Sequence, residues 1–262
     1  MSDNILEINN LSKYFGGLAA VSDCSIKVKR GTITGIIGPN GSGKTTLFNL
    51  IAGNLKSSGG SVTFDDENIT DVPSYELFSK GLLRTFQIAH EFSNLSVLEN
   101  LMMVPGNQSG EKLMTALFKP GLVAKEEAEV KEKAKEVVEF LNLGHLSNEL
   151  AGNLSGGQKK LLELGRTMMV DAKLVLLDEV GAGVNRTLLK DLGTAIEKLN
   201  KEKGYTFCMI EHDMDFIGRL CDPVIVMAEG SVLFEGTVDE AKKDEKVIES
   251  YLGRGSKLKD EV

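Results

Sequence analysis

Alternation between apolar and polar residues predicts a β-rich region in the N-terminal part of the chain. Residues 5–8 and 25–29 are short, partly alternating stretches, as half-buried antiparallel strands are. Residues 32–37 are more uniformly apolar, which is typical of a strand covered on both faces. An apolar helix is expected at 46–52 and a further strand at 61–64. This region therefore combines an expected antiparallel β region with the first strand and helix of a parallel sheet.

The spacing of the apolar residues changes near residue 85. Residues 125–143 are charged but carry apolar side chains every three or four positions, which predicts an amphipathic helix. Residues 105–121 have little pattern and are expected to form a loop or insertion, and a further helix is expected at 155–170. These features predict a helical insertion between about residues 87 and 150.

Strands and helices alternate in the C-terminal part, which predicts the rest of a parallel α/β core. Strands are expected at residues 173–178, 206–210, 224–227 and 231–235, and a helix at 187–200. We therefore expect a single domain over residues 1–262, with a core subdomain at 1–86 and 155–252, a helical subdomain at 87–154 and a charged, frayed tail at 253–262.

The composition is that of an ordinary soluble globular protein, and it disfavours several kinds of site. The 262 residues carry a formal net charge of −8, which argues against nucleic-acid binding because that affinity comes from a basic surface. The 3 cysteines are widely spaced without a CxxC pair, which argues against a disulfide framework or a cysteine zinc site. No signal peptide is readable, and no apolar run approaches the roughly 20 residues of a membrane span. A soluble, cytoplasmic chain is expected.

A glycine-rich segment joins the strand expected at 32–37 to the helix that follows. Its sequence, Gly-Pro-Asn-Gly-Ser-Gly-Lys-Thr, matches the phosphate-binding pattern GxxxxGK[ST] in the strand–loop–helix context that this pattern requires. Loop amides and the helix N-terminus can hold phosphate oxygens. Lys44 can reach the β- and γ-phosphates, and the Thr45 hydroxyl can ligate Mg²⁺. The alternative is an ordinary glycine-rich turn. The expected nucleotide-binding residues are Gly38, Pro39, Asn40, Gly41, Ser42, Gly43, Lys44, Thr45 and Thr46.

Two carboxylates follow the apolar run at 174–177. A carboxylate at the C-terminal end of a buried parallel strand lies on the side of the sheet where ligands bind, so Asp178 is expected to hold Mg²⁺. Glu179 is expected to act as the general base or to position the water that attacks the γ-phosphate. The alternative is an ordinary acidic pair at the end of a strand. Together with the glycine-rich segment, these residues predict a P-loop ATPase.

A second anion-binding design begins the helix expected at 155–170. The sequence Leu-Ser-Gly-Gly-Gln places a hydroxyl, two glycines and free helix amides at Ser155, Gly156, Gly157 and Gln158. With this motif, the chain strongly resembles the ATP-binding-cassette (ABC) ATPases over about residues 5–252. The resemblance implies a P-loop NTPase core, with a RecA-like parallel sheet, an N-terminal antiparallel β region and a helical subdomain insertion. It also implies ATP and Mg²⁺ as ligands.

Three further residues receive roles from this resemblance. Phe15 matches the aromatic residue that stacks on adenine, with Tyr14 as the alternative; without the resemblance, core packing would be the preferred interpretation of Phe15. Gln87 matches the glutamine that contacts Mg²⁺ and the attacking water and links the core to the helical insertion. His212 matches the histidine that contacts the γ-phosphate. His90 and His145 match no such position and are interpreted as surface or packing residues.

The resemblance also implies that two cassettes pair head to tail. Ser155 and Gly157 then contact the ATP held by the partner's phosphate loop, so that ATP binding closes the pair and hydrolysis releases it. Two residues depart from the family pattern. Val180 stands where the family usually has proline, and Asn185 stands where many members have aspartate in the D-loop. Neither change removes a phosphate-binding or metal-binding group, so hydrolysis is still expected.

Within the family, several segments resemble the ATPase subunits of branched-chain amino acid importers, the LivG type. These segments are Phe15–Val21, Arg84–Gln87, Val97–Leu101, 105–129, Ala182–Asn185, Glu211–Met214 and Tyr251–Gly253. The resemblance implies two transmembrane permease subunits, a second ABC ATPase, and an extracytoplasmic solute-binding protein as an indirect partner. It places the chain on the inner face of the cell membrane. We expect an apolar strip to receive a cytoplasmic permease helix. The strip consists of Phe86, Ile88, Phe92, Leu95 and Val97. For each of these residues, the alternative is burial within the helical subdomain.

Other functions fit the sequence less well. An importer for urea, amides or another polar solute would use a similar ATPase, because solute selectivity lies in other subunits. DNA-repair ATPases of this superfamily carry a long coiled coil between the phosphate loop and the signature, and translation factors carry two cassettes; neither feature is present here. A GTP switch is disfavoured because no NKxD motif follows the phosphate loop.

Overall fold

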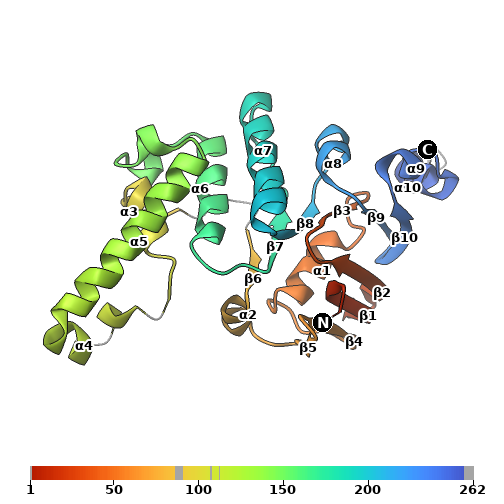
Figure 1. The fold of residues 1–262 in the computed structure, drawn as a ribbon. Coiled ribbons are helices and arrows are strands. Elements are labelled where there is room, and N and C mark those ends of the chain that lie inside the picture. Colours follow the sequence, from red (N-terminus) through yellow and green to blue (C-terminus); the bar gives the residue numbers. More distant parts are fainter. Residues whose placement is uncertain (1, 86–90, 107, 112, 257–262) are drawn as a thin grey trace. The chain divides into compact units, whose positions relative to one another are not determined.

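The computed structural model describes residues 2–85, 91–106, 108–111 and 113–256 (Figure 1). Their internal contacts divide them into two compact units, which we call the sheet unit and the helical unit. The sheet unit comprises Met1–Gln87, Lys173–Gly181 and Ile196–Val262, and the helical unit comprises Ile88–Ala172 and Ala182–Ala195.

A six-stranded sheet forms the centre of the sheet unit. In spatial order its strands are β10 (Ser231–Gly236), β9 (Val224–Ala228), β3 (Ile33–Ile37), β8 (Thr206–Ile210), β7 (Leu174–Asp178) and β6 (Leu82–Arg84). Strands β9 to β6 are parallel, and β10 is antiparallel to β9. Every residue of β3, β7 and β8 is buried, as expected for a sheet covered on both faces. The predicted parallel core is confirmed, and the carboxyl ends of its strands share one edge.

A second, antiparallel sheet lies in the same unit. Its strands, in spatial order, are β2 (Leu18–Lys29), β1 (Asn4–Phe15), β4 (Gly59–Phe64) and β5 (Glu67–Asn68). Strands β1 and β2 extend well beyond the predicted 5–8 and 25–29. Their pairing shifts register between Ile8 and Leu11, and Asn10 and Asp23 have φ values of 48° and 46°. Because bulges of this kind interrupt the alternation of apolar residues, the sequence pattern was visible only in part of each strand.

Five helices lie wholly within the described part of the sheet unit. They are α1 (Lys44–Ile51), α2 (Ser74–Lys80), α8 (Met214–Leu220), α9 (Val238–Ala241) and α10 (Glu245–Ser256). Helix α1 contributes Leu47, Phe48 and Ile51 to a core shared with strands of both sheets. This packing fixes the start of α1, and therefore the glycine-rich segment, beside β3. Helix α10 continues to Ser256, past the predicted start of the tail at residue 253.

The helical unit is built around one long helix. Its elements are α3 (Val97–Met102), η1 (Ser109–Glu111), α4 (Leu113–Phe118), α5 (Pro120–Phe140), η2 (Gly144–Leu146), η3 (Ala151–Asn153) and α6 (Gly156–Met168). Helix α5 packs against α3 and α6 (Figure 1). A Cβ atom at Gly165 would lie 2.7 Å from Leu141 Cδ1, so glycine permits the close approach of α6. Helix α7 (Arg186–Lys203) starts in this unit and ends in the sheet unit.

Two expectations about the insertion differ from the structure. The loop expected at 105–121 is wrong, because this stretch holds η1, α4 and the first turn of α5, which Pro120 begins. The apolar side chains of α4 are exposed rather than packed on one side, so no amphipathic pattern marked the helix. Helix α6, expected in the core subdomain, groups with the helical unit because it packs on α3 and α5. Among the described residues, no helix is both long and apolar enough to cross a bilayer.

Candidate functional site

The glycine-rich segment forms a tight turn between β3 and α1. Gly38, Gly41 and Gly43 all have positive φ, at 149°, 78° and 100°. A Cβ atom at Gly38 would lie 2.1 Å from the Met227 carbonyl oxygen, and one at Gly43 would lie 2.4 Å from the Ala20 carbonyl oxygen. Both the backbone angles and the space therefore require glycine at these two positions.

Lys44 is the first residue of α1 and is 6% exposed. Its Nζ donates to the Gly38 carbonyl oxygen at 2.8 Å, to the Pro39 carbonyl oxygen at 3.0 Å and to Ser42 Oγ at 3.3 Å. The ammonium group is thus held inside the turn. Gly43, the N-cap of α1, makes no side-chain capping bond and no acidic residue lies in the first turn, so the start of this helix combines backbone amides with a positive charge, which suits an anion.

Thr45 and Asp178 offer oxygen ligands of different character. Thr45 is exposed, whereas Asp178 is 3% exposed at the end of β7. Asp178 Oδ2 accepts a bond from Arg84 Nη2 at 2.7 Å, and Arg84 Nη1 donates to Asn49 Oδ1 at 2.6 Å. Sequence reasoning assigned no role to Arg84 beyond its place in a family motif. The sequence carries no signal for this contact, because the two residues are 94 positions apart and no strand was expected at 82–84.

Glu179 and His212 meet at the carboxyl ends of two adjacent strands, β7 and β8. His212 Nε2 lies 3.0 Å from Glu179 Oε1, with the side chains 47% and 20% exposed. The Glu179 N–H donates to the Ile210 carbonyl oxygen at 2.9 Å, and Glu179 has φ 49°, a left-handed conformation that is unfavourable outside glycine. The structure therefore brings together two residues that are 33 positions apart in the sequence.

Glu211 is a buried carboxylate next to this pair that sequence reasoning left without a role. It is 4% exposed, and its Oε1 accepts the Gly181 N–H at 2.7 Å while its Oε2 accepts the His212 N–H at 3.4 Å. Burial, with a smaller contribution from the charge of Glu179, raises the pKa of this carboxyl group. An acid directly after the mostly apolar strand at 206–210 was the available signal.

The signature segment forms the N-terminus of α6 in the helical unit. Ser155 is the N-cap, and it forms a capping box with Gln158: Ser155 Oγ accepts the Gln158 N–H at 3.4 Å, and Gln158 Oε1 accepts the Ser155 N–H at 2.9 Å. Gly157 is buried, and a Cβ atom there would lie 2.5 Å from Leu188 Cδ1. Ser155 and Gly156 are exposed. The motif thus builds an accessible helix start.

Asn185 caps the start of α7. Its Oδ1 accepts the Leu188 N–H at 3.0 Å, and its side chain is exposed. Aspartate would accept the same bond, so the departure from the family pattern preserves this local function.

Phe15 lies at the end of β1 and is 48% exposed, with Lys13 Nζ 5.2 Å from its ring centroid. The ring is therefore outside the core, and the packing interpretation of this residue is wrong. Tyr14 is 47% exposed. Gln87, which the resemblance assigns to Mg²⁺ and the attacking water, lies outside the described residues.

The expected docking strip is only partly accessible. Phe92 is 47% exposed and stacks with Arg166, whose Cζ lies 5.5 Å from the ring centroid. Val97 is fully buried in the first turn of α3, so its assignment to an accessible strip is wrong. Leu95 is half-buried. Phe86, Ile88 and His90 lie outside the described residues, and His145 is exposed, as expected.

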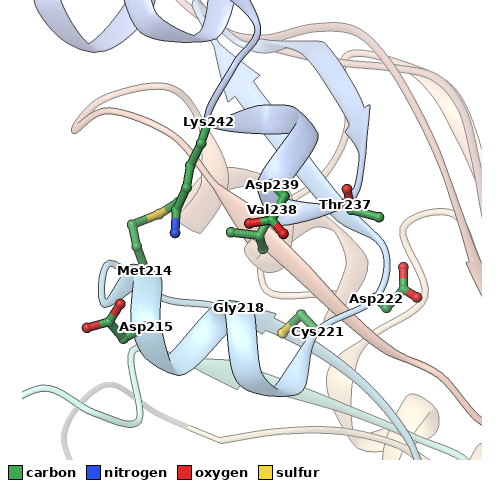
Figure 2. A pocket seen from close by; sticks show the side chains of 9 residues that line it. All are labelled: Met214, Asp215, Gly218, Cys221, Asp222, Thr237, Val238, Asp239 and Lys242. Atoms are coloured by element: carbon green, nitrogen blue, oxygen red, sulfur yellow. The ribbon is translucent and has the colours of Figure 1, made fainter.

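A separate cavity of about 390 Å³ lies between α8 and α9 (Figure 2). It is lined by Met214, Asp215, Gly218, Cys221, Asp222, Thr237, Val238, Asp239 and Lys242. None of the expected nucleotide-binding or catalytic residues belongs to this lining, so we do not assign the cavity to the ATP site.

Comparison with known proteins agrees with this geometry. The ABC transporter family matches residues 21–182, and the family described as "Branched-chain amino acid ATP-binding cassette transporter" matches residues 231–257. Two archaeal proteins called "Probable branched-chain amino acid transport ATP-binding protein LivG" are similar. The Archaeoglobus fulgidus protein is 44% identical over 95% of both chains, and the Methanocaldococcus jannaschii protein is 43% identical over 95% of this chain and 97% of its own.

A solved structure has the same fold. The ADP conformation of MJ1267, an ATP-binding cassette of an ABC transporter, is 40% identical and covers 96% of this chain and 100% of its own, with a TM-score of 0.81. The expected ABC ATPase fold is confirmed by this likeness. With a family match over more than half of its length and relatives above 40% identity, the chain belongs to the ABC transporter family, as one of its ATP-binding ATPase subunits.

Proposed function

We propose that this chain is the ATP-hydrolysing motor subunit of an importer for branched-chain amino acids. The contact between Glu179 and His212, at the carboxyl ends of the adjacent strands β7 and β8, carries the catalytic part of this proposal, because β8 lies next to the phosphate-loop strand β3. The similarity to LivG-type proteins over 95% of the chain supports the solute class.

ATP is held by the sheet unit in this proposal. Phe15 stacks on adenine, which its exposed ring permits. The amides of the turn that starts at Gly38 bind the phosphate oxygens, and Lys44 exchanges its contacts with loop carbonyl oxygens for contacts with the β- and γ-phosphates. An ammonium group that is already held inside the turn is ready for this exchange.

The donor groups near the turn fit Mg²⁺. This ion prefers hard oxygen ligands and keeps waters or substrate phosphates among them, so a protein needs to supply only one or two. Thr45 offers an exposed hydroxyl and Asp178 a carboxylate, and we assign both, with Gln87, to hold the ion. Bound Mg²⁺ would neutralise charge that develops on the phosphates.

Hydrolysis follows from the pair at the strand ends. The Glu179 carboxylate orients the attacking water and accepts its proton, and His212 binds the γ-phosphate. His212 already approaches Glu179 at 3.0 Å, so one contact keeps both side chains at the same edge of the sheet.

Two cassettes act together in this proposal. The exposed helix start at Ser155 and Gly156 would bind the γ-phosphate of an ATP held by the partner cassette, which is either a second related ATPase or another copy of this chain. ATP then favours the closed pair, and hydrolysis favours the open one. Two permease subunits receive this motion at the inner face of the cell membrane, and an extracytoplasmic protein delivers the solute to them.

The test uses the variant Glu179→Gln. Gln keeps the size of the side chain but cannot accept the proton, so we expect ATP binding close to wild type and a loss of turnover of at least about 100-fold. The E179Q chain with Mg-ATP is used as bait in native membranes to identify its partners. The same partners are then reconstituted with the wild-type chain, and ATP-dependent leucine uptake is measured.

The outcomes separate the parts of the proposal. Recovery of two permeases with leucine uptake supports the importer. Uptake of urea or an amide but not of leucine would replace the solute class and keep the motor. Unchanged turnover in E179Q would remove the catalytic assignment, and a complex containing only soluble partners would remove transport.

A further inference from the structure

Glu211 is a buried charge that the proposed chemistry does not use. It is 4% exposed at the end of β8. The Gly181 and His212 N–H groups donate hydrogen bonds to it, and the charges of Glu179 and His212 act on it in opposite directions. Burying a carboxylate with so little compensation is unfavourable. A neutral amide could accept the same N–H with a smaller desolvation cost, so the feature that the turn requires here is a buried acceptor and not its charge.

Three contacts join the segment after β7 to the end of β8. The Glu179 N–H donates to the Ile210 carbonyl oxygen at 2.9 Å, and His212 Nε2 lies 3.0 Å from Glu179 Oε1. Glu211 Oε1 accepts the Gly181 N–H at 2.7 Å. The last two contacts run in opposite directions. Glu179, after β7, contacts His212 after β8, and Glu211, after β8, contacts Gly181 after β7. Residues 179–181 are therefore held from both sides.

The backbone of Glu179 needs such a restraint. Its φ of 49° is unfavourable for a residue with a side chain. Proline at the next position would restrict the turn, but this chain has Val180, whose side chain is buried. The bond from Gly181 to Glu211 comes two residues after Glu179 and restricts the same turn from its other end.

We propose that Glu211 is a positioning residue for ATP hydrolysis: it anchors the turn at Gly181 and thereby keeps the Glu179 carboxylate beside His212. The inference rests on the proposed role of Glu179. Both carboxylate oxygens of Glu211 accept backbone N–H groups, from Gly181 and from His212, so its effect passes through the turn. It should therefore influence the rate of hydrolysis and not the affinity for ATP.

The experiment compares Glu211→Ala with Glu211→Gln in the full-length chain, assayed with its captured partners. In E211A the anchor is lost, and we expect kcat to fall roughly 10- to 100-fold with KM for ATP within about twofold of wild type, because a small displacement of a catalytic group is costly. In E211Q the amide oxygen still accepts the Gly181 N–H, so kcat should stay within about threefold of wild type. Amide hydrogen exchange at 179–183 should be faster in E211A only.

Two controls make the result specific. Glu240→Ala removes another carboxylate that accepts a backbone N–H, from Thr237 at 2.8 Å, and should leave kcat and KM unchanged. E179Q tests the proposed function separately. If E179Q is inactive and E211A keeps wild-type kcat, or if E211A and E211Q lose activity equally with a raised KM, the positioning role is wrong. If E179Q keeps turnover, both proposals are wrong.

Discussion

The sheet unit and the helical unit present their proposed ATP contacts in opposite ways. In the sheet unit, Lys44 and Asp178 are 6% and 3% exposed, and both are engaged by neighbouring polar groups. In the helical unit, Ser155 and Gly156 are exposed, and the helix start depends on bonds within residues 155–158. The Asp178 carboxylate thus receives buried support from Arg84 on another strand, whereas Lys44 is held inside its own turn. A surface that offers backbone amides to a second cassette needs only local support.

The largest difference is expected where buried support is removed. Arg84→Ala leaves the Asp178 carboxylate, at 5% side-chain exposure, without its ion-pair partner. Because an unpaired buried charge is strongly unfavourable, unfolding free energy should fall by about 3–5 kcal/mol. Urea denaturation measures the change. Lys80→Ala breaks the exposed pair with Glu67 and should cost less than about 1 kcal/mol. Equal losses in the two variants would contradict the importance of burial.

A glycine-to-alanine pair compares the backbone of the two units. Gly38→Ala places Cβ 2.1 Å from the Met227 carbonyl oxygen at φ 149°, so the unfolding free energy should fall by at least about 2 kcal/mol. Gly121→Ala, in α5, meets no atom within 4 Å and should be neutral or stabilising by up to about 1 kcal/mol. Thermal unfolding of both variants checks the difference, and a mild effect of G38A would show that the turn can shift.

The dependence of stability on pH distinguishes a buried carboxylate from an exposed one. Burial raises the pKa of Glu211, so its contribution to stability is fully present below the ordinary carboxyl pKa and is lost as pH rises through the raised value. Hydrogen bonds from Thr237 lower the pKa of Glu240, so its contribution is present above the ordinary pKa and is lost as pH falls. Urea unfolding from pH 4 to 8 measures the unfolding free energy of wild type minus that of each variant. This difference should fall with rising pH for E211Q, and it should rise with pH for E240Q. The same slope for both variants would contradict the assignment.

The smallest effect is expected at the start of α7. Asn185→Asp keeps a side-chain acceptor for the Leu188 N–H, so the free energy of unfolding should change by no more than about 0.5 kcal/mol. Asn185→Ala removes the acceptor and should cost about 1 kcal/mol. Thermal unfolding compares the two, and an aspartate variant as unstable as the alanine variant would show that capping is not the role of Asn185.

Local patterns predicted most strands of the sheet unit, but not β5, β6 or helices α2, α8, α9 and α10. Strands β3, β7 and β8 are short and mostly apolar, and each apolar run is followed by a glycine or an acidic residue, so both the buried sheet and the edge that carries Asp178 could be predicted. The glycine-rich turn was equally clear. Helix α4 was missed because its large apolar side chains, Leu113, Met114, Leu117 and Phe118, are mostly exposed, so they form no one-sided apolar pattern.

The supporting contacts could not be predicted from the sequence. Arg84 and Asp178 are 94 positions apart, and Glu211 and Gly181 are 30 apart. Such pairs depend on which strands are neighbours and on the direction of each side chain at the strand end. Spacing in the chain shows neither. The nucleotide-binding residues were therefore easier to predict than the residues that hold them in place.

The Ser155–Gln158 capping box has a consequence for how the surface at α6 is maintained. Because both halves of the box come from the same four residues, the helix start is already ordered before any second cassette arrives. Binding there would forfeit little conformational entropy. Glutamate could replace Gln158 and still complete the box. The substitutions that residue 158 accepts are thus decided by capping of α6. The helix start needs no partner to become ordered.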